Sequence, residues 1–251
     1  MHERRLYAHR GASAERPENT MPAFERALEV GVDAIETDVH LTRDGHLIVS
    51  HDETAARMTG SQRAWADITL EDARRLDAGW GFVARDGTRP FAGKGITIPT
   101  FEELLVAFPH ARINVDLKGA SSVDPMLALL RKHDAADRVT LATFQTATAL
   151  TLRRRGYTGE TALSQGEVAT LVTLPAVLWR QLPFTGTAAQ LPPKHGPMHF
   201  DRASFIAKCH AIGLRVDFWV IDDATEARRL LDLGADGIMT NDPAGLRSVF
   251  A

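Results

Sequence analysis

The sequence has 251 residues, of which 44% are hydrophobic and 24% are charged, and its formal net charge is -3. This length suits one α/β barrel, so we predict a single domain over residues 1–251. The charge pattern excludes the broad basic stripe that a nucleic-acid-binding face needs, because the one tight basic cluster, residues 153–155, lies where a helix would end. No run of about 18 apolar residues occurs, so we expect no stable membrane insertion and a cytoplasmic location. Cys209 is the single cysteine, which excludes an intramolecular disulfide.

Short β-branched runs alternate with longer amphipathic runs along the chain. This alternation is typical of repeated βα units around a parallel sheet. The predicted strands are residues 4–9, 33–39, 112–118, 138–144, 159–164, 186–191, 214–221 and 236–240. Eight such strands, the last followed by a helix, predict a (β/α)8 barrel.

Capping residues mark the starts of several predicted helices. Asn19 or Thr20 is expected to cap the helix that follows the first strand. Thr100 and Glu103 have the spacing of a capping box, and Asp223 precedes the helical run before the last strand.

A hairpin is predicted directly after the second strand, where Asp44-Gly45 separates two apolar runs. If these two residues form the whole loop, counting outward places His51 opposite Asp38. A slip of one residue would move His51 to the other face of the hairpin.

Residues 53–98 are too long for a simple connection, so we predict an insertion after the hairpin, over one end of the barrel. Its aromatic residues are Trp65, Trp80, Phe82 and Phe91. They are expected either to bury a small core of their own or to line the mouth of a pocket.

Acidic residues alternate along two predicted strands. Glu36 and Asp38 share one strand face, and Asn114, Asp116 and Lys118 share a face of the next parallel strand. Buried carboxylates without a cation would cost several kcal/mol in a barrel interior. Oxygen ligands with no cysteine nearby favour Mg2+ or Ca2+ over zinc.

Two histidines and two cations lie near the same strand ends: His9, His51, Arg10 and Lys118. Hydrolysis of a phosphoester needs a divalent ion and a basic side chain beside the non-bridging oxygens. It also needs one group that deprotonates the nucleophile and one that protonates the leaving alkoxide. Histidines can share these two roles, since their pKa is near neutrality.

In order, these motifs resemble those of the glycerophosphodiester phosphodiesterase family, relatives of the phosphatidylinositol-specific phospholipases C. The matching segments are HRG at 9–11, PENT at 17–20, ETD at 36–38, HD at 51–52, DLK at 116–118, FWVID at 218–222 and DGIMTNDP at 236–243. The resemblance covers essentially the whole chain. It implies a (β/α)8 barrel that hydrolyses glycerophosphodiesters, such as glycerophosphocholine or glycerophosphoethanolamine, to an alcohol and glycerol 3-phosphate with a divalent metal.

The resemblance also implies a role for each candidate residue. The acid/base pair is His9 and His51, the substrate contacts are Arg10, Lys118 and Trp219, the metal ligands are Glu36, Asp38 and Asp116, and Glu18 and Asn19 lie beside the metal. Which histidine is the acid stays open, as does whether water or the substrate's own hydroxyl is the nucleophile.

The chain departs from the family pattern at four positions. Asp116 stands where Glu is common, which leaves the choice of metal open. Val220, Asp222 and Asn241 stand where Thr, Asn and Asp are common, and we expect these three to affect packing more than chemistry.

Other interpretations remain at this point. The same site could act as a lysophospholipase D if the insertion binds an acyl chain, or the barrel could be a catalytically idle binding protein. An unrelated barrel hydrolase or isomerase acting on a sugar is the remaining alternative. At single positions, Lys118 could be a structural partner of the acids, Trp219 a core residue, and Glu18 a helix-entry acid.

Overall fold

The computed structural model describes residues 2–174, 184 and 186–250. The strands are β1 (Arg5–His9), β2 (Ala34–Leu41), β3 (Leu47–Val49), β4 (Ile113–Leu117), β5 (Val139–Ala142), β6 (Ala188–Leu191), β7 (Lys194–His195), β8 (Met198–His199), β9 (Arg215–Phe218) and β10 (Gly237–Thr240). The helices are α1 (Met21–Val30), α2 (Ala56–Thr59), α3 (Leu70–Arg74), α4 (Phe101–Ala107), α5 (Val123–Lys132), α6 (Thr146–Arg154), α7 (Gln165–Thr173), α9 (Ala203–His210), α10 (Ala224–Asp232) and α11 (Pro243–Leu246). Within the described ranges, no helix has the length and apolar character needed to cross a membrane.

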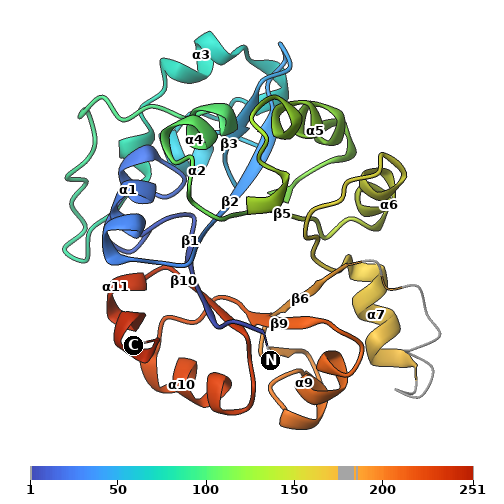
Figure 1. Ribbon diagram of the computed structural model, residues 1–251. Helices are drawn as coiled ribbons and strands as arrows, with labels where there is room; N and C mark the ends of the chain where they lie inside the picture. Colours follow the sequence, from blue (N-terminus) through green and yellow to red (C-terminus); the bar gives the residue numbers. More distant parts are fainter. Residues whose placement is uncertain (1, 175–183, 185, 251) are drawn as a thin grey trace.

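The parallel strands form a closed barrel. Their order in the sheet is β5-β4-β2-β1-β10-β9-β6. The two ends of this sheet are joined by Thr161, which bridges Leu141 of β5, and by Ala162, which bridges Ala188 of β6. The predicted strand over 159–164 is thus reduced to two bridging residues. Figure 1 shows the ring of strands with the helices outside it, and the (β/α)8 prediction is confirmed.

Side chains alternate between the outside and the inside of the barrel. Outward residues of β2 and β4, such as Ile35 and Val115, are buried in one apolar cluster with α4 and α5. The intervening residues face inward, where Glu36 of β2 lies in register with Asn114 of β4. Apolar residues normally fill a barrel interior. In this barrel the core therefore lies between strands and helices, and the interior is polar.

Two of the three predicted helix caps are confirmed. Thr100 forms a capping box with Glu103, and the Asp223 side chain accepts a hydrogen bond from the backbone of α10. The predicted side-chain cap of α1 is wrong. Thr20 occupies the N-cap position, but its hydroxyl donates to the Pro17 carbonyl at 2.5 Å. The Asn19 side chain instead forms hydrogen bonds with Asp38 and Thr37 of β2.

The hairpin of β2 and β3 is present, but its predicted two-residue loop is wrong. The backbone N–H of Thr42 donates to the carbonyl of His46 at 2.9 Å, so three residues form the loop. The third is a glycine with φ 83°, which suits a three-residue hairpin. The register therefore slips by one residue, and Ser50 rather than His51 pairs with Asp38.

The insertion buries a small core. Residues 53–98 contain α2, α3 and two short 3-10 helices, and Trp65 is fully buried among their apolar side chains. Its Nε1 donates to Ser50 Oγ at 3.0 Å and to the Asp52 carbonyl at 2.9 Å. In the view of Figure 1 the segment lies outside the ring of strands. Trp65 thus anchors the insertion to the residues on either side of His51.

We expect Trp65→Ala to lower the free energy of unfolding by about 3–5 kcal/mol, because it removes a fully buried indole and leaves a cavity. Chemical denaturation of both proteins measures this difference. Val83→Ala is the control, since Val83 lies in the same segment and is 52% exposed. A loss for Trp65→Ala no larger than that of the control would contradict the role of Trp65 as the anchor.

Candidate active site

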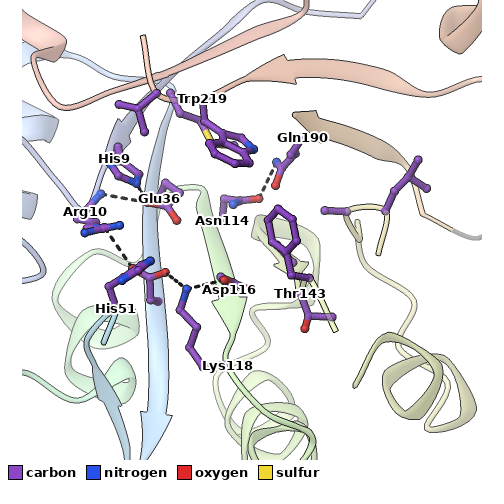
Figure 2. A pocket seen from close by; sticks show the side chains of 17 residues that line it. His9, Arg10, Glu36, His51, Asn114, Asp116, Lys118, Thr143, Gln190 and Trp219 are labelled. Carbon is purple, nitrogen blue, oxygen red and sulfur yellow. Dashed lines mark hydrogen bonds and ion pairs between the residues drawn. The ribbon is translucent and has the colours of Figure 1, made fainter. Parts of the chain in front are cut away.

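A pocket of about 230 Å³ lies at the carboxyl ends of the barrel strands, the end at which barrel enzymes build their active sites. One side is polar and is lined by His9, Arg10, Glu36, Asp38, His51, Asn114, Asp116, Lys118 and Gln190. The other side includes Phe144, Trp219, Val220 and Met239. Figure 2 shows the two histidines, the two cations and the acids converging on one space. Eight of the ten predicted site residues therefore line a single pocket.

Lys118 joins two of the predicted metal ligands. Its Nζ lies 2.7 Å from Asp38 Oδ1 and 2.6 Å from Asp116 Oδ2. Burial alone would raise the pKa of Asp38, but Lys118 and then Arg10 bring it below its ordinary value. Burial likewise opposes the charge of Lys118, yet the two carboxylates raise its pKa. The bridge thus keeps Asp38 and Lys118 charged inside the barrel.

The remaining acid groups lack full compensation. Glu36 is buried and forms no ion pair with Arg10 or Lys118 among the described residues; its Oε2 accepts from the backbone N–H of Arg10 at 3.1 Å. Burial, followed by Asp38, raises the pKa of Glu36 well above its ordinary value. Burial also raises the pKa of Asp116, and its Oδ1 is buried without a hydrogen-bond partner. The unpartnered buried oxygen of Asp116, beside two further carboxyl groups, fits a hard divalent cation with oxygen ligands.

The carboxylates are not yet arranged around such an ion. In the part of the chain that the structure describes, no group of three or more His, Cys, Asp or Glu side chains forms a metal-binding arrangement. The ammonium of Lys118 lies between Asp38 and Asp116. Lys118 contacts one oxygen of each acid, so the second oxygens, Asp38 Oδ2 and Asp116 Oδ1, are the ones that would face a metal while the bridge is kept.

Arg10 is held at the pocket by its backbone and by two acids. Its backbone N–H donates to the carbonyl of Glu36 at 2.9 Å, and its φ is 57°. Its side chain lies 3.6 Å from Asp38 and 3.2 Å from Glu18. The next residue, Gly11, has φ 80°, and a Cβ there would lie 2.7 Å from the backbone of Ala23. This turn therefore requires glycine.

His9 is oriented by Asn241 and, through it, by Asp222, two contacts that the sequence did not predict. Its Nδ1 lies 2.7 Å from Asn241 Oδ1, and Asn241 Nδ2 donates to Asp222 at 2.8 Å. Because a carboxylate only accepts, Asp222 turns the amide oxygen toward His9, and Nδ1 of His9 carries the proton. Burial and then Arg10 lower the pKa of His9. Positions 222 and 241 therefore contact a predicted catalytic residue, and whether they affect packing more than chemistry stays a prediction.

These two departures from the family pattern form a matched exchange. By the resemblance described above, Asn is common at position 222 and Asp at 241, whereas this chain has Asp222 and Asn241. In this chain a hydrogen bond joins the two positions, and the negative charge is on Asp222, which does not contact His9 directly. The pairing became visible only in the fold, because the two positions are on different strand ends.

His51 lines the pocket although its predicted register is wrong. Its Nδ1 lies 2.7 Å from Asp52, and Asp52 accepts from Arg57 Nε at 2.6 Å. Arg57 also pairs with Glu18, which contacts Arg10. Arg57 was not predicted to matter, because its five-residue separation from Asp52 carries no motif. Through its ion pairs with Asp52 and Glu18, Arg57 links the segment that carries His51 to the segment that carries Arg10.

The two residues predicted to lie beside the metal occupy different places. Asn19 is fully buried, donates to Asp38 at 3.3 Å and accepts from the Thr37 hydroxyl at 2.8 Å. Glu18 does not line the pocket and instead contacts Arg10 and Arg57. Asn19 thus positions Asp38, a predicted metal ligand, and Glu18 positions Arg10, a predicted phosphate contact.

Trp219 follows β9 and lines the apolar side of the pocket. Its ring lies 5.9 Å from that of Phe144, in an edge-to-face arrangement. Phe144 is 57% exposed at the rim. Trp219 is therefore a pocket residue rather than part of the core between strands and helices.

We expect the double variant Asp222→Asn with Asn241→Asp to raise the pKa of His9. The hydrogen bond between the two positions is retained, while a carboxylate replaces the amide oxygen at Nδ1 and stabilises the imidazolium. An NMR titration of the His9 ring protons, identified by their absence in His9→Ala, measures the change. Asp222→Asn alone is the control, and a His9 pKa that is unchanged or lower in the double variant would refute this account.

Comparison with known proteins agrees with the geometry. Residues 9–245 match the model of the "Glycerophosphoryl diester phosphodiesterase family". A glycerophosphodiester phosphodiesterase of Caldanaerobacter subterraneus is 30% identical, with 96% of this chain and 95% of that protein aligned. A lysophospholipase D of Homo sapiens is 27% identical, with 96% and 84% aligned.

The fold is also found among solved structures. A phosphodiesterase of Oleispira antarctica, in complex with the product sn-glycerol-3-phosphate, superposes with a TM-score of 0.77 at 19% identity, over 98% of this chain and 96% of that chain. At this identity the likeness shows the fold alone. Because the family match covers nearly the whole chain, the protein belongs to the glycerophosphoryl diester phosphodiesterase family and is a phosphodiester hydrolase.

Proposed function

We propose that this enzyme hydrolyses glycerophosphodiesters to an alcohol and sn-glycerol 3-phosphate, with His9 and His51 as acid and base and with Mg2+ or Ca2+ as cofactor. The observation that carries the proposal is that both histidines, both cations and all three acids line one pocket. A small phosphodiester is the expected partner, without nucleic acid, and we retain the predicted cytoplasmic location.

The histidines are prepared for proton transfer. Each ring has its Nδ1 occupied, by Asn241 at His9 and by Asp52 at His51. Nε2 is then the nitrogen left to exchange a proton with substrate. Burial lowers the pKa of His9 and so favours the neutral ring, which is the form that accepts a proton. His9 is thus suited to the base role, which leaves the acid role to His51.

Arg10 and Lys118 supply positive charge for the non-bridging oxygens of the phosphate. Both are already oriented by carboxylates, so little rearrangement is needed when substrate binds. Glu36, Asp38 and Asp116 would hold the divalent ion, which would offset the charge of the phosphate in the transition state. The Lys118 ammonium has three donors and uses two of them on its acids, so the third is left for a phosphate oxygen.

A lysophospholipid is the second candidate substrate, through the same chemistry. It is favoured by the exposed aromatic rim, where Phe144 and Val220 are 57% and 37% exposed beside Trp219. None of the described residues 53–98 lines the pocket, so acyl contacts would come from this rim rather than from the insertion. A catalytically idle barrel is disfavoured by the complete set of acids, bases and cations.

We expect His9→Ala and His51→Ala each to lower kcat by about 10²- to 10⁴-fold, the usual contribution of general acid–base catalysis. Affinity for inorganic phosphate should be retained, since Arg10 and Lys118 remain. Steady-state kinetics with glycerophosphocholine and calorimetry with phosphate measure the two effects. His110→Ala is the matched control on the surface, and full activity in either pocket variant would exclude that histidine from catalysis.

The substrate and metal are tested together by release of glycerol 3-phosphate from glycerophosphocholine and glycerophosphoethanolamine. Each reaction is run with Mg2+, with Ca2+ and with a chelator, beside detergent-dispersed lysophosphatidylcholine. We expect metal-dependent release from the short diesters and loss of activity with the chelator. Turnover of the lysolipid alone would reassign the substrate, undiminished turnover with the chelator would exclude the metal, and no turnover at all would favour the idle barrel.

A further inference from the structure

The floor of the pocket carries two amide side chains that the catalytic proposal does not use. Asn114 is on β4 and is 2% exposed, while Gln190 is on β6 across the barrel. Gln190 Nε2 donates to Asn114 Oδ1 at 3.0 Å. Figure 2 shows this pair beside Trp219 and Glu36. Both residues line the pocket.

The polarity of this pair is set from deeper in the barrel. Asp217, fully buried on β9, accepts from Arg215 at 3.1 Å and from the Tyr7 hydroxyl at 3.2 Å. Gln190 Nε2 lies 3.4 Å from the same carboxylate. Because a carboxylate accepts and an amide nitrogen donates, Asp217 orients the Gln190 amide so that its Nε2 faces Asp217. The Arg215–Asp217 ion pair therefore fixes the orientation of the Gln190 amide, and Gln190 in turn fixes that of Asn114.

Each amide then has one atom left over. Since Gln190 uses Nε2 and Asn114 uses Oδ1, the remaining atoms are the acceptor Oε1 of Gln190 and the donor Nδ2 of Asn114. Neither has a hydrogen-bond partner among the described residues, and neither is a buried atom sealed from solvent. The pocket floor thus presents one fixed donor and one fixed acceptor.

The Asn114–Gln190 pair lies deeper in the barrel than the proposed phosphate site, at a distance that the glycerol chain can span. Asn114 and Asp116 face inward on the same strand, two residues and therefore about 6.6 Å apart. Asp116 and Lys118 are at the level proposed for the phosphate. A three-carbon chain attached to a phosphate at that level reaches toward the amides. A hydroxyl both donates and accepts, so it matches the two free atoms.

We infer that Asn114 and Gln190 form a hydroxyl-recognition subsite for the glycerol moiety, with Asp217 as a positioning residue. The inference rests on the proposed function and extends it to substrate choice. The enzyme selects glycerol esters over phosphodiesters of simple alkyl alcohols, because only glycerol hydroxyls satisfy both amides.

The test compares two ligands that differ only in hydroxyl groups. sn-Glycerol 3-phosphate and propyl phosphate are titrated into the enzyme by calorimetry in buffer containing Mg2+. We expect the wild-type enzyme to bind glycerol 3-phosphate about 10-fold more tightly, which corresponds to about 1.4 kcal/mol. In Gln190→Met this preference should disappear while the Kd for propyl phosphate stays the same. Gln62→Met, an exposed site in the insertion, is the matched control and should keep both affinities.

Two further variants separate recognition from folding. Asn114→Ala removes the donor and should also abolish the preference. Asp217→Asn should lower the preference for sn-glycerol 3-phosphate, because Gln190 is no longer held in one orientation, while propyl phosphate still binds. The inference would be overturned if Gln190→Met and Asn114→Ala both kept the preference for sn-glycerol 3-phosphate. It would also be overturned if both variants lost affinity for the two ligands equally. Either result would leave the proposed function standing. Binding of neither ligand by the wild-type enzyme would overturn the proposed function and the inference with it.

Discussion

The bridge from Lys118 to Asp38 and Asp116 is the interaction on which the active-site end of the barrel depends. It joins β2 and β4 through two contacts of 2.7 and 2.6 Å. Without it, adjacent buried carboxylates would repel each other in a region of low dielectric. The bridge leaves Glu36 without an ion pair to either cation and Asp116 Oδ1 without a hydrogen-bond partner among the described residues, and the divalent ion that we propose would supply positive charge there. Stability and chemistry are therefore linked through the same three side chains.

A polar barrel interior has consequences for the whole architecture. Because inward positions hold charged and amide groups, the apolar cores lie outside the ring, between strands and helices. Each polar group inside must then be oriented by another. Asp217, a buried carboxylate, orients Gln190, and Gln190 orients Asn114, so the buried charge determines which amide atoms face the pocket. At the end of the barrel the exposed carboxylate of Asp222 orients Asn241 in the same way.

Charge also organises the pocket mouth. His51, Asp52, Arg57, Glu18 and Arg10 form a continuous series of ion pairs and hydrogen bonds. The series connects the residue after β1 to the segment after β3 and ties both to the insertion, whose Trp65 fixes the backbone around His51. The insertion therefore contributes to the site by holding a histidine in place, although none of its described residues lines the pocket.

Local patterns in the sequence determined a large part of this protein. The alternation of strands and helices predicted the barrel, and the two-residue period placed Glu36, Asp38 and Asp116 inside it, because side-chain direction along a strand follows from backbone geometry alone. Tertiary structure decided the rest: the three-residue loop that shifted His51, the partners of His9 at 222 and 241, and the amide pair of Asn114 and Gln190. These depend on contacts between residues far apart in the chain, and spacing along one strand carries no information about such contacts.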